Sequence, residues 1–463
     1  VAKVKFDSIP EATKWVNEYK NVTNFEYFGN TRHQYPFIAD EFPGKVDWDL
    51  SQIKMLSIDI ECESENGFPS PDKAAEPLIC ITVKDYTTKK IIVFGQGNFV
   101  NDREDVQYFN CSTETHLIEM FTKFWVEYNP DIITGWNVKF FDIPYLMNRF
   151  KNIMGEQWIQ QFSPWGIVNE GTALGLGYNR TEAYFDLLGV TTLDYLDLYR
   201  KHTFVRRESY KLDHIGEVEL GQNKLDNPYD TFKEFYQNDY QRFVEYNIQD
   251  VELVDKLEDK MQLIALHLTM AYEAKVNYQD VFGQVRIWDC IIYNHLRSKN
   301  IVPPAIQESK TSDGYEGAYV KDPVVGFHDW ICSFDLNSLY PHLIMQYNIS
   351  PETMVGFEPN RVNVENMLNE KSDLSDLDGR TITPNGAQFR IDKRGFLPEL
   401  MDTLYQERVV YKKKMIEAQK MYQQTGDKKY EFEIAKNHNI QLARKIALNS
   451  AYGAIGNQYF RYF

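Results

Sequence analysis

Ile53-Lys54-Met55-Leu56-Ser57-Ile58-Asp59-Ile60-Glu61 predicts a buried β-strand, because its residues are mostly apolar and several are β-branched. Asp59 and Glu61 are two positions apart, so their side chains point to the same face of that strand. Carboxylates at the end of an apolar strand are costly to bury unless a cation pairs with them. The strand therefore suggests a metal site, although such a pair alone also fits a solvent-facing edge.

The surrounding sequence predicts that this strand belongs to a mixed sheet covered by helices. Strands are expected at residues 78–84, 90–94 and 132–135, and a long loop or hairpin at residues 165–188. Apolar spacing predicts helices at residues 11–19, 115–128 and 144–150, and one long helix at residues 240–268. Strands that alternate with helices indicate an α/β fold.

Two further carboxylates stand at positions suited to the same site. Asp142 comes just before a predicted helix, where the N-terminal dipole favours an anion. Tyr246 and Asp250 are four residues apart on one helix face. Together with Asp59 and Glu61, Asp142 and Asp250 could hold two Mg²⁺ or Mn²⁺ ions roughly 3.5–4 Å apart, one activating a water and the other stabilising the leaving oxygen of a phosphodiester. Tyr246 could orient that water. We expect the nearby Asp194 and Asp197 to be structural or peripheral.

The C-terminal part predicts an anion site. Residues 330–334 are expected to form a strand that ends at Asp335, a possible Mg²⁺ ligand for a triphosphate. Helices are predicted at residues 399–422 and 430–451, joined by a turn. Each helix carries a polar stripe on one face: Arg408 and Lys412 on the first; Lys445, Asn449 and Tyr452 on the second. Facing cations on two antiparallel helices can grip a triphosphate, with Arg forking across its oxygens.

Composition and charge set broader bounds. The chain has 463 residues, which suggests two to four domains, and its net charge is −17, which taken alone disfavours a nucleic-acid partner. The charge is uneven, however, because residues 394–463 carry +5 and residues 1–393 carry −22. No apolar run approaches the ~20 residues that span a bilayer, so no membrane partner is expected. Five widely spaced cysteines indicate a reducing cytoplasm. The absence of an initiator Met suggests that the sequence begins inside a longer reading frame.

Three of these motifs resemble the exonuclease motifs of family B DNA polymerases. They are Asp59-Ile60-Glu61, the stretch from Trp136 to Pro144 that contains Asn137, Phe141 and Asp142, and Tyr246-Asn247-Ile248-Gln249-Asp250. Their order and spacing match the family's 3′→5′ proofreading domain, which has a ribonuclease H-like fold. The resemblance implies that Asp59, Glu61, Asp142 and Asp250 bind the catalytic metals and that Tyr246 positions the water.

Two later motifs resemble the polymerase motifs of the same family. Asp335-Leu336-Asn337-Ser338-Leu339-Tyr340-Pro341 resembles motif A, which implies that Asp335 and the Leu336 carbonyl bind metal and that Tyr340 excludes a 2′-OH. The stretch from Lys445 to Gly453 resembles motif B. Lys445, Asn449 and Tyr452, together with Arg408 and Lys412, would then bind the incoming deoxynucleotide. Tyr315-Glu316-Gly317-Ala318 stands where the family has an element between its exonuclease and palm regions.

The resemblance covers almost the whole chain and points to replicative polymerases of large tailed phages of the myovirus type. It implies the following division: a partial N-terminal domain at 1–53, the exonuclease domain at 54–262, a return segment at 263–305, the first part of the palm at 306–394, a helical-hairpin fingers domain at 395–457, and a palm re-entry at 458–463. Nothing in the sequence resembles motif C, the Tyr-x-Asp-Thr-Asp that carries the second catalytic Asp.

The expected function is therefore that of a portion of a DNA-directed DNA polymerase with a 3′→5′ exonuclease, using two Mg²⁺ or Mn²⁺ ions per active site. Expected partners are primer–template DNA, a single-stranded 3′ end, deoxynucleoside triphosphates, a sliding clamp, and a second polypeptide or missing C-terminal part that carries motif C and the thumb. The implied location is the cytoplasm of an infected bacterium. The isolated chain is expected to act only as an exonuclease.

Two alternatives remain at this point. One is a stand-alone exonuclease of the same fold, which would leave the polymerase motifs without a purpose. The other is a non-catalytic nucleic-acid-binding or scaffold protein, which would neither bind divalent metal nor degrade DNA.

Overall fold

The protein consists of two compact units, one of which is continuous in sequence. The computed structural model describes residues 4–29, 32–64, 67, 69–174, 181–203, 205–304 and 320–462. One unit comprises Asp47–Leu268, and the other combines Val1–Val46 with Thr269–Phe463. Each unit has its own hydrophobic core.

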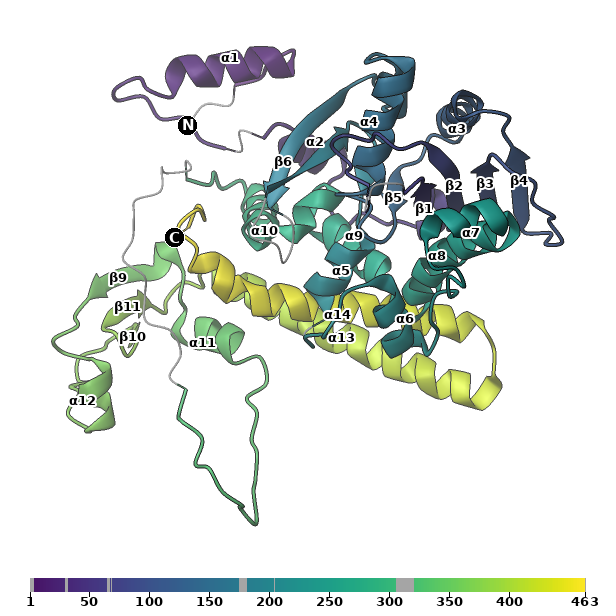
Figure 1. Cartoon of the computed structure of the whole chain (residues 1–463). Helices are drawn as coiled ribbons and strands as arrows, with labels where there is room; N and C mark the ends of the chain where they lie inside the picture. The colour runs from purple at the N-terminus through teal and green to yellow at the C-terminus, as the bar shows by residue number, and fades with distance from the viewer. Residues whose placement is uncertain are drawn as a thin grey trace. The chain divides into compact units, whose positions relative to one another are not determined.

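A six-stranded mixed sheet organises the continuous unit (Figure 1). Its strands are β1 (Met55–Cys62), β2 (Leu78–Asp85), β3 (Ile91–Gly95), β4 (Val106–Asn110), β5 (Ile132–Thr134) and β8 (Thr191–Thr192), in the order β4-β3-β2-β1-β5-β8. Strand β1 runs antiparallel to β2 and parallel to β5. The mixed α/β sheet predicted from the sequence is therefore confirmed, while strand β4 was not predicted.

Helices cover both faces of this sheet, and the alternation of side chains along β1 explains how. Ile58 and Ile60 of β1 pack into a core with residues of α3 (Glu114–Tyr128) and α4 (Asp142–Met154). The opposite face packs against α7 (Phe232–Asn238) and α8 (Tyr240–Met261), for example through Ile79 and Val93 of the sheet. Because residues alternate between faces, Asp59 and Glu61 of β1 are directed to the side that α8 covers.

The remaining elements of this unit connect and extend the sheet. They are the antiparallel hairpin of β6 (Val168–Leu174) and β7 (Thr181–Leu187), the helices α5 (Tyr195–His202) and α6 (Leu212–Leu220), and the short 3-10 helices η1 (Leu50–Gln52) and η2 (Trp158–Phe162). Helix α9 (Leu263–Ala274) begins in this unit and contains the division between the two units, which falls after Leu268. The hairpin agrees with the loop or hairpin predicted at residues 165–188, although residues 175–180 lie outside the described part.

The long helix predicted at residues 240–268 is wrong in one respect. Gln262 adopts a left-handed conformation with φ 53° and ends α8, after which α9 begins at Leu263. Buried Glu258 accepts hydrogen bonds from the backbone N–H groups of Ile264 and Ala265, at 3.0 and 3.2 Å. Its carboxylate thus satisfies donors at the start of α9, which stabilises the break.

The second unit is mainly helical. Its elements are α1 (Ile9–Tyr19), α2 (Gln34–Glu41), η3 (Tyr278–Phe282), α10 (Gln284–Ser298), α11 (Leu339–Tyr347), η4 (Pro351–Thr353), α12 (Val364–Leu368), α13 (Phe396–Thr425), α14 (Lys429–Ile455), and a three-stranded sheet of β9 (Met354–Phe357), β10 (Arg380–Ile382) and β11 (Ala387–Arg390). Helices α13 and α14 form the predicted helical hairpin, and Gly426 ends α13 in a left-handed conformation with φ 66°.

The core of this unit lies where the hairpin meets α10 and α11. Trp288 of α10, Met401 of α13 and Leu448 of α14 are buried together there. The Trp288 indole Nε1–H donates to Ala447 O at 3.2 Å and to Ser450 Oγ at 3.1 Å. This packing fixes the base of the hairpin, while its exposed faces carry the polar stripes predicted from the sequence.

The strand predicted at residues 330–334 is also wrong. The segment has no strand pairing within the described residues, Trp330 has a left-handed backbone with φ 57°, and Trp330 and Phe334 are 99% and 93% exposed. A strand is stabilised only by hydrogen bonds to a neighbouring strand, which the apolar pattern of the segment itself cannot supply. The predicted boundary at 305/306 and the Tyr315–Ala318 element lie outside the described residues.

Within the described ranges, we find no helix that is both long enough and apolar enough to cross a membrane.

Candidate metal centre

Strand β1 contributes the first two carboxylates of the site. Asp59 pairs in register with Thr82 of β2, and Glu61 pairs with Cys80 just before the register shifts at Cys62. The irregularity places Glu61 at the end of the regular β1–β2 ladder, where a strand commonly changes direction. Both side chains are partly buried on the face that α8 covers.

Helix α4 contributes Asp142 at its first position. The carboxylate is buried, and its Oδ1 accepts a hydrogen bond of 3.1 Å from the Ile60 N–H, between the two acidic residues of β1. The approach of the chain to α4 is tight, because a Cβ on Gly135 would lie 2.5 Å from the Ile58 carbonyl oxygen. Glycine at this position therefore lets the loop before α4 reach β1.

Helix α8 contributes the remaining predicted residues. Asp250 is buried, Tyr246 is one turn earlier on the same face, and Asn247 between them is completely buried. The Asn247 amide Nδ2–H donates to Asp59 Oδ2 at 2.6 Å. One carboxylate oxygen from each of Asp59, Glu61 and Asp250 lies within 4.8 Å of the others. The structure thus brings the predicted carboxylates of β1 and α8 together, with Asp142 bonded to the same strand.

Lys224 is a member of this cluster that the sequence did not indicate. Its ammonium Nζ donates to Asp250 Oδ2 and lies 3.4 Å from the Tyr246 hydroxyl. The residue stands in the connection between α6 and α7, and its backbone N–H donates to Asp213 Oδ1 at 2.8 Å. No spacing or motif in the sequence connects a single lysine in a loop with a carboxylate 26 residues later.

The electrostatics of the cluster follow from crowding several carboxylates in a buried space. Burial first, and then Asp250, Asp142 and Glu61, raise the pKa of Asp59 well above its ordinary value. Burial and the nearby Asp250 raise the pKa of Glu61 to about 8. Burial also raises the pKa of Asp142 to about 7, although the Ile60 N–H opposes this shift.

Lys224 only partly compensates for these negative charges. Burial raises the pKa of Asp250, whereas Lys224 works to lower it. Burial tends to lower the pKa of Lys224 itself, but Asp250, Tyr246 and Asp59 together raise it above its ordinary value. Among the described residues, Lys224 is therefore the one cation that contacts this group of four carboxylates, and a bound divalent cation would stabilise the ionised carboxylates further.

The donor set fits hard divalent cations such as Mg²⁺ or Mn²⁺. Carboxylate oxygens are the ligands that these ions prefer, and three of them already converge within bonding reach of a common point. In addition, the buried oxygens Asp250 Oδ1 and Asn247 Oδ1 accept no hydrogen bond from any described residue. Buried acceptors of this kind need a donor or a cation, and a hydrated metal ion would supply both.

Asp194 and Asp197 take no part in the cluster of converging oxygens. The Asp194 carboxylate accepts hydrogen bonds from the N–H groups of Asn137, Lys139 and Leu196, at 3.1, 3.0 and 2.9 Å. Asn137 has a left-handed backbone with φ 66°, in the loop that leads to Asp142. Asp194 thus shapes this loop, in agreement with the structural role expected for it.

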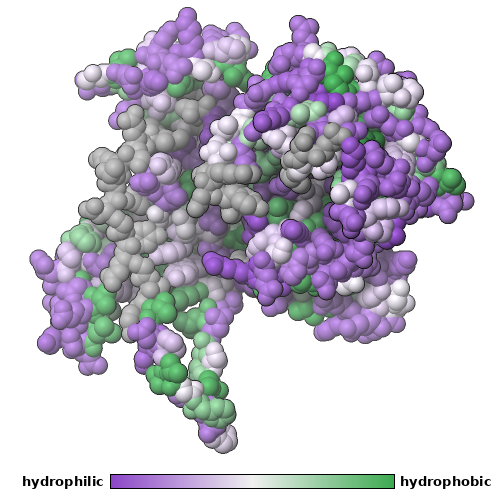
Figure 2. Space-filling view, viewed as in Figure 1, coloured by the Kyte–Doolittle hydropathy of each residue, from purple (hydrophilic) through white to green (hydrophobic). Residues whose placement is uncertain are grey.

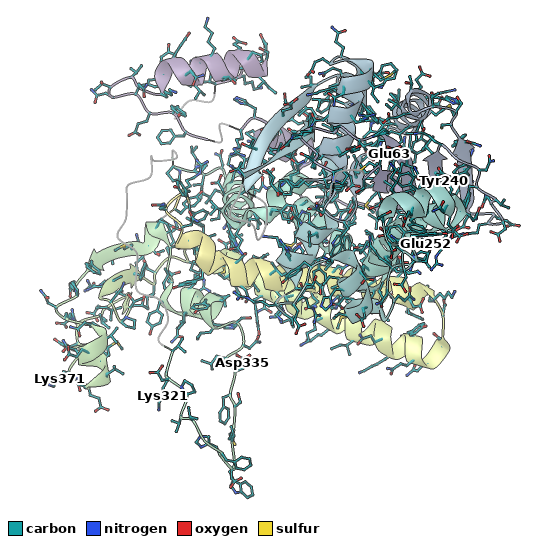
Figure 3. The ribbon with its side chains drawn as sticks, in the orientation of Figure 1. Glu63, Tyr240, Glu252, Lys321, Asp335 and Lys371 are labelled. Atoms are coloured by element: carbon teal, nitrogen blue, oxygen red, sulfur yellow. The ribbon has the colours of Figure 1, made fainter. Side chains whose placement is uncertain are left out.

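The predicted nucleotide-binding residues lie in the second unit. Asp335 and Leu336 lie on the exposed loop before α11, and Figure 3 labels Asp335 and Lys321 on the two arms of that loop. Arg408 Nη1–H donates to Ser338 Oγ at 3.3 Å, which links α13 to the start of α11. The rings of Tyr340 and Tyr452 stack with centroids 4.5 Å apart and planes inclined by 13°.

The other predicted residues of this group are exposed on the helical hairpin. Lys412 lies on α13, and Lys445 and Asn449 lie on α14. The structure thus brings Tyr340 and Tyr452 together and places Arg408 close to motif A. The side chains of Asp335 and Leu336 are exposed, and within the described residues the Asp335 carboxylate has no hydrogen bond or ion pair.

Comparisons with known proteins agree with both groups of motifs. The family description "DNA polymerase family B, exonuclease domain" matches residues 29–215, and "DNA polymerase family B" matches residues 279–463. The chain belongs to the family B DNA polymerases. The first match contains Asp59, Glu61 and Asp142, and the second contains every residue assigned above to nucleotide binding.

Individual relatives extend the similarity over the full chain. The DNA-directed DNA polymerase of Escherichia phage RB69 is 31% identical over 99% of this chain, and that of Enterobacteria phage T4 is 30% identical over 100%. The DNA polymerase delta catalytic subunit of Caenorhabditis elegans is 28% identical over 88% of the chain and is covered over 37% of its own length. The chain spans 57% and 58% of the two phage proteins, a little more than half of their length.

Proposed function

We propose that the continuous unit is a metal-dependent 3′→5′ exonuclease and that the second unit carries part of a DNA polymerase site. The observation that carries the first half is the convergence of Asp59, Glu61 and Asp250 oxygens within 4.8 Å. The metal ions would be Mg²⁺ or Mn²⁺, two per site. The named phage relatives, which are DNA-directed DNA polymerases, support DNA as the substrate.

In the proposed reaction the chain's own residues hold and orient the reacting groups. Asp59, Glu61, Asp142 and Asp250 would bind the metals, which when bound supply a hydroxide at neutral pH and stabilise the leaving oxygen. The Tyr246 hydroxyl, beside Lys224 and one turn from Asp250, would accept or donate a hydrogen bond to the attacking water. Lys224 would hold the Asp250 carboxylate and offset its charge as the phosphate approaches.

A single substitution tests the exonuclease proposal. Asp142→Ala removes a carboxylate that is hydrogen-bonded to β1, and we expect loss of at least about 100-fold in cleavage rate, because a metal ligand stabilises the transition state directly. The assay is shortening of a 5′-labelled single-stranded oligonucleotide in Mg²⁺, with EDTA as a blank. Glu127→Ala, on the exposed face of α3, is the matched control and should retain full activity.

The outcomes separate the alternatives. Unchanged cleavage by Asp142→Ala would defeat the assignment of the site. A chain that neither binds divalent metal nor shortens DNA would favour the non-catalytic reading, whereas metal-dependent cleavage without any nucleotide binding would favour a stand-alone exonuclease.

For the polymerase part we propose that Asp335, the Leu336 carbonyl, Tyr340, Arg408, Lys412, Lys445, Asn449 and Tyr452 bind the incoming deoxynucleotide and its metals. The stacked Tyr340–Tyr452 pair and the exposed cations of the helical hairpin support this proposal. The domain division inferred from the sequence, with palm at 306–394 and fingers at 395–457, is proposed with it. Fluorescence titration with a deoxynucleoside triphosphate, for the chain and for Lys445→Ala, measures this binding.

Polymerisation also needs the second catalytic Asp, which family B polymerases carry in motif C. We propose that a polypeptide bearing motif C and the thumb, whether continuous with this chain or separate, packs on the exposed loop before α11. The exposed apolar side chains Val325, Phe327 and Trp330 support this, since a patch of this kind commonly marks a contact surface. Figure 2 shows hydrophobic residues gathered on this loop. Primer extension with and without that polypeptide is the test.

Two further proposals remain, the first from the family resemblance noted in the sequence and the second from the phage relatives. A sliding clamp would hold the enzyme on primer–template DNA, and the protein would act in the cytoplasm of an infected bacterial host. Co-purification with the clamp of the same phage would test the first.

A further inference from the structure

Asn247 occupies an unusual position between the two predicted functional residues of α8. It follows Tyr246 directly and precedes Asp250 by three positions, and its side chain is completely buried. Its neighbours Val244 and Ile248 pack into the apolar core between α8 and the sheet. A buried amide beside such a core needs hydrogen-bond partners, because an unpaired polar group there is costly.

The partner that the structure supplies is a carboxylate of the metal centre. The Asn247 Nδ2–H donates to Asp59 Oδ2 at 2.6 Å, across 188 residues of sequence. A hydrogen bond from an amide to a carboxylate of this length belongs to the stronger, charge-assisted kind. It links the helix that carries Asp250 to the strand that carries Asp59 and Glu61, and it fixes the rotation of the Asp59 carboxylate.

We propose that Asn247 is a positioning residue that orients Asp59 for metal binding, an inference that rests on the proposed exonuclease function. With Oδ2 engaged by the amide, the Oδ1 atom of Asp59 is the oxygen left for a metal ion. The Asn247 Nδ2–H group is a donor and cannot bind a cation, so it distinguishes the two oxygens of Asp59 by occupying only Oδ2. Substituting a residue that hydrogen-bonds to a metal ligand typically lowers metal affinity or activity by about 10- to 100-fold.

The other end of the same amide supports this role. Asn247 Oδ1 is buried and accepts no hydrogen bond from the described residues, and the same is true of Asp250 Oδ1 on the next turn of the helix. Both atoms are acceptors on one short stretch of α8, next to the converging carboxylates. Water molecules bound to a metal ion would donate hydrogen bonds to both oxygens. An asparagine with a purely structural role would not need such donors, because its amide oxygen would be paired within the protein.

The test replaces the amide by an apolar group of similar size and measures metal binding directly. Asn247→Leu is titrated with Mn²⁺ in the full chain, and the free ion is followed by electron paramagnetic resonance. We expect the Kd for Mn²⁺ to rise by about 10- to 100-fold, the range found when residues behind metal ligands are removed. The Mg²⁺ concentration that half-saturates cleavage should rise in parallel, while the Kd for single-stranded DNA in EDTA stays within about twofold of wild type.

A matched control separates positioning from general loss of structure. Asn148 of α4 is an asparagine of the same unit whose Nδ2–H donates to Pro71 O at 3.0 Å. Asn148→Leu removes one amide hydrogen bond without touching a carboxylate, so its Mn²⁺ affinity should equal that of wild type. If circular dichroism shows that Asn247→Leu is unfolded, Asn247→Ala is titrated in its place.

The outcomes are distinct from those that test the exonuclease itself. Wild-type Mn²⁺ affinity in a folded Asn247 variant would overturn the positioning role but leave the proposed function standing. Equal weakening in the Asn247 and Asn148 variants would overturn it too, since the effect would then be structural. A wild-type chain that binds no Mn²⁺ would overturn both proposals.

Discussion

Lys224→Met should destabilise the metal-free protein much more than the metal-bound protein. Lys224 is the one cation that contacts the carboxylate cluster among the described residues, through its ion pair with Asp250. Methionine keeps most of the side-chain length and apolar stem but removes the charge. Four carboxylates with raised pKa values would then face one another without compensation unless a divalent cation is present.

The size of the effect can be bounded from the geometry. Two unit charges about 4 Å apart attract by about 4 kcal/mol at an effective dielectric constant of about 20. Breaking a fully buried pair costs about 3–5 kcal/mol, and an exposed pair contributes about 0–1 kcal/mol. The Asp250 side chain is 2% exposed but that of Lys224 is 25% exposed. Allowing for that exposure and for the cost of desolvating Lys224, we expect a loss of about 2 kcal/mol.

Thermal unfolding in two buffers measures this loss. For a domain the size of the continuous unit, about 2 kcal/mol lowers Tm by about 4–8 °C, which we expect for Lys224→Met in EDTA at pH 8. In 10 mM Mg²⁺ the difference from wild type should shrink to about 2 °C or less, because the metal supplies the missing positive charge. Lys123→Met, on an exposed position of α3, controls for the loss of one positive charge elsewhere.

Equal losses of Tm in EDTA and in Mg²⁺ would refute the reasoning, since the role of Lys224 would then be independent of the metal site. A variant that matches wild type in EDTA would refute it as well, because the ion pair with Asp250 would contribute nothing.

Three further predictions follow from other contacts. Raising the pH from 6 to 9 should strengthen Mn²⁺ binding, because protons on Glu61, with a pKa of about 8, and Asp142, with a pKa of about 7, must leave before metal binds. The same raised pKa values mean that the metal-free fold loses stability as the pH rises from about 4 to 8, because in that range the folded state binds more protons than the unfolded state. Calorimetric titration with Mn²⁺ in two buffers measures the protons released on metal binding. A Kd for Mn²⁺ that is independent of pH would contradict the prediction for metal binding. Gly97→Ala should lower the free energy of unfolding by about 1–3 kcal/mol in urea, since a Cβ there would lie 2.6 Å from the Tyr240 ring at the start of α8. Gly283→Ala, whose Cβ would lie 3.5 Å from its nearest neighbour, should have a smaller effect. Trp288→Phe should cost about 1–3 kcal/mol, because the Ala447 carbonyl and Ser450 hydroxyl lose a buried donor; Trp165→Phe, at an exposed tryptophan, is the control, and equal stability of the two variants would contradict the prediction.

The sequence predicts those parts of the fold whose signal is local. The apolar, β-branched residues around Asp59 predict β1, and the apolar spacing of residues 399–422 and 430–451 predicts most of α13 and α14. The acidic residues at the ends of these local elements were likewise recognisable, because strand alternation and helix periodicity place them on known faces. Figure 3 shows Tyr240 and Glu252 on α8, and the first residue of this helix was predicted correctly.

The parts that the sequence missed depend on contacts between distant residues. Lys224 joins the site only because the loop after α6 returns to α8, and the Asn247–Asp59 hydrogen bond connects residues 188 positions apart. The end of α8 at Gln262 gave no signal, since glutamine is a good helix former and a left-handed conformation there depends on the Glu258 carboxylate behind it. Residues 330–334 have the composition of a strand, but composition cannot supply a pairing partner.

The division of the second unit into two separated stretches has a consequence for synthesis on the ribosome. Residues 1–46 meet their own unit only after the 222 residues of Asp47–Leu268 have been made. At about 5–20 residues per second, this interval lasts roughly 11–45 s, long enough for the continuous unit to fold first. During that time Tyr35 lacks Asp280, to which its hydroxyl donates at 2.6 Å, and Asp40 lacks its partner Arg297. The first segment of the chain therefore lacks these partners while the continuous unit folds.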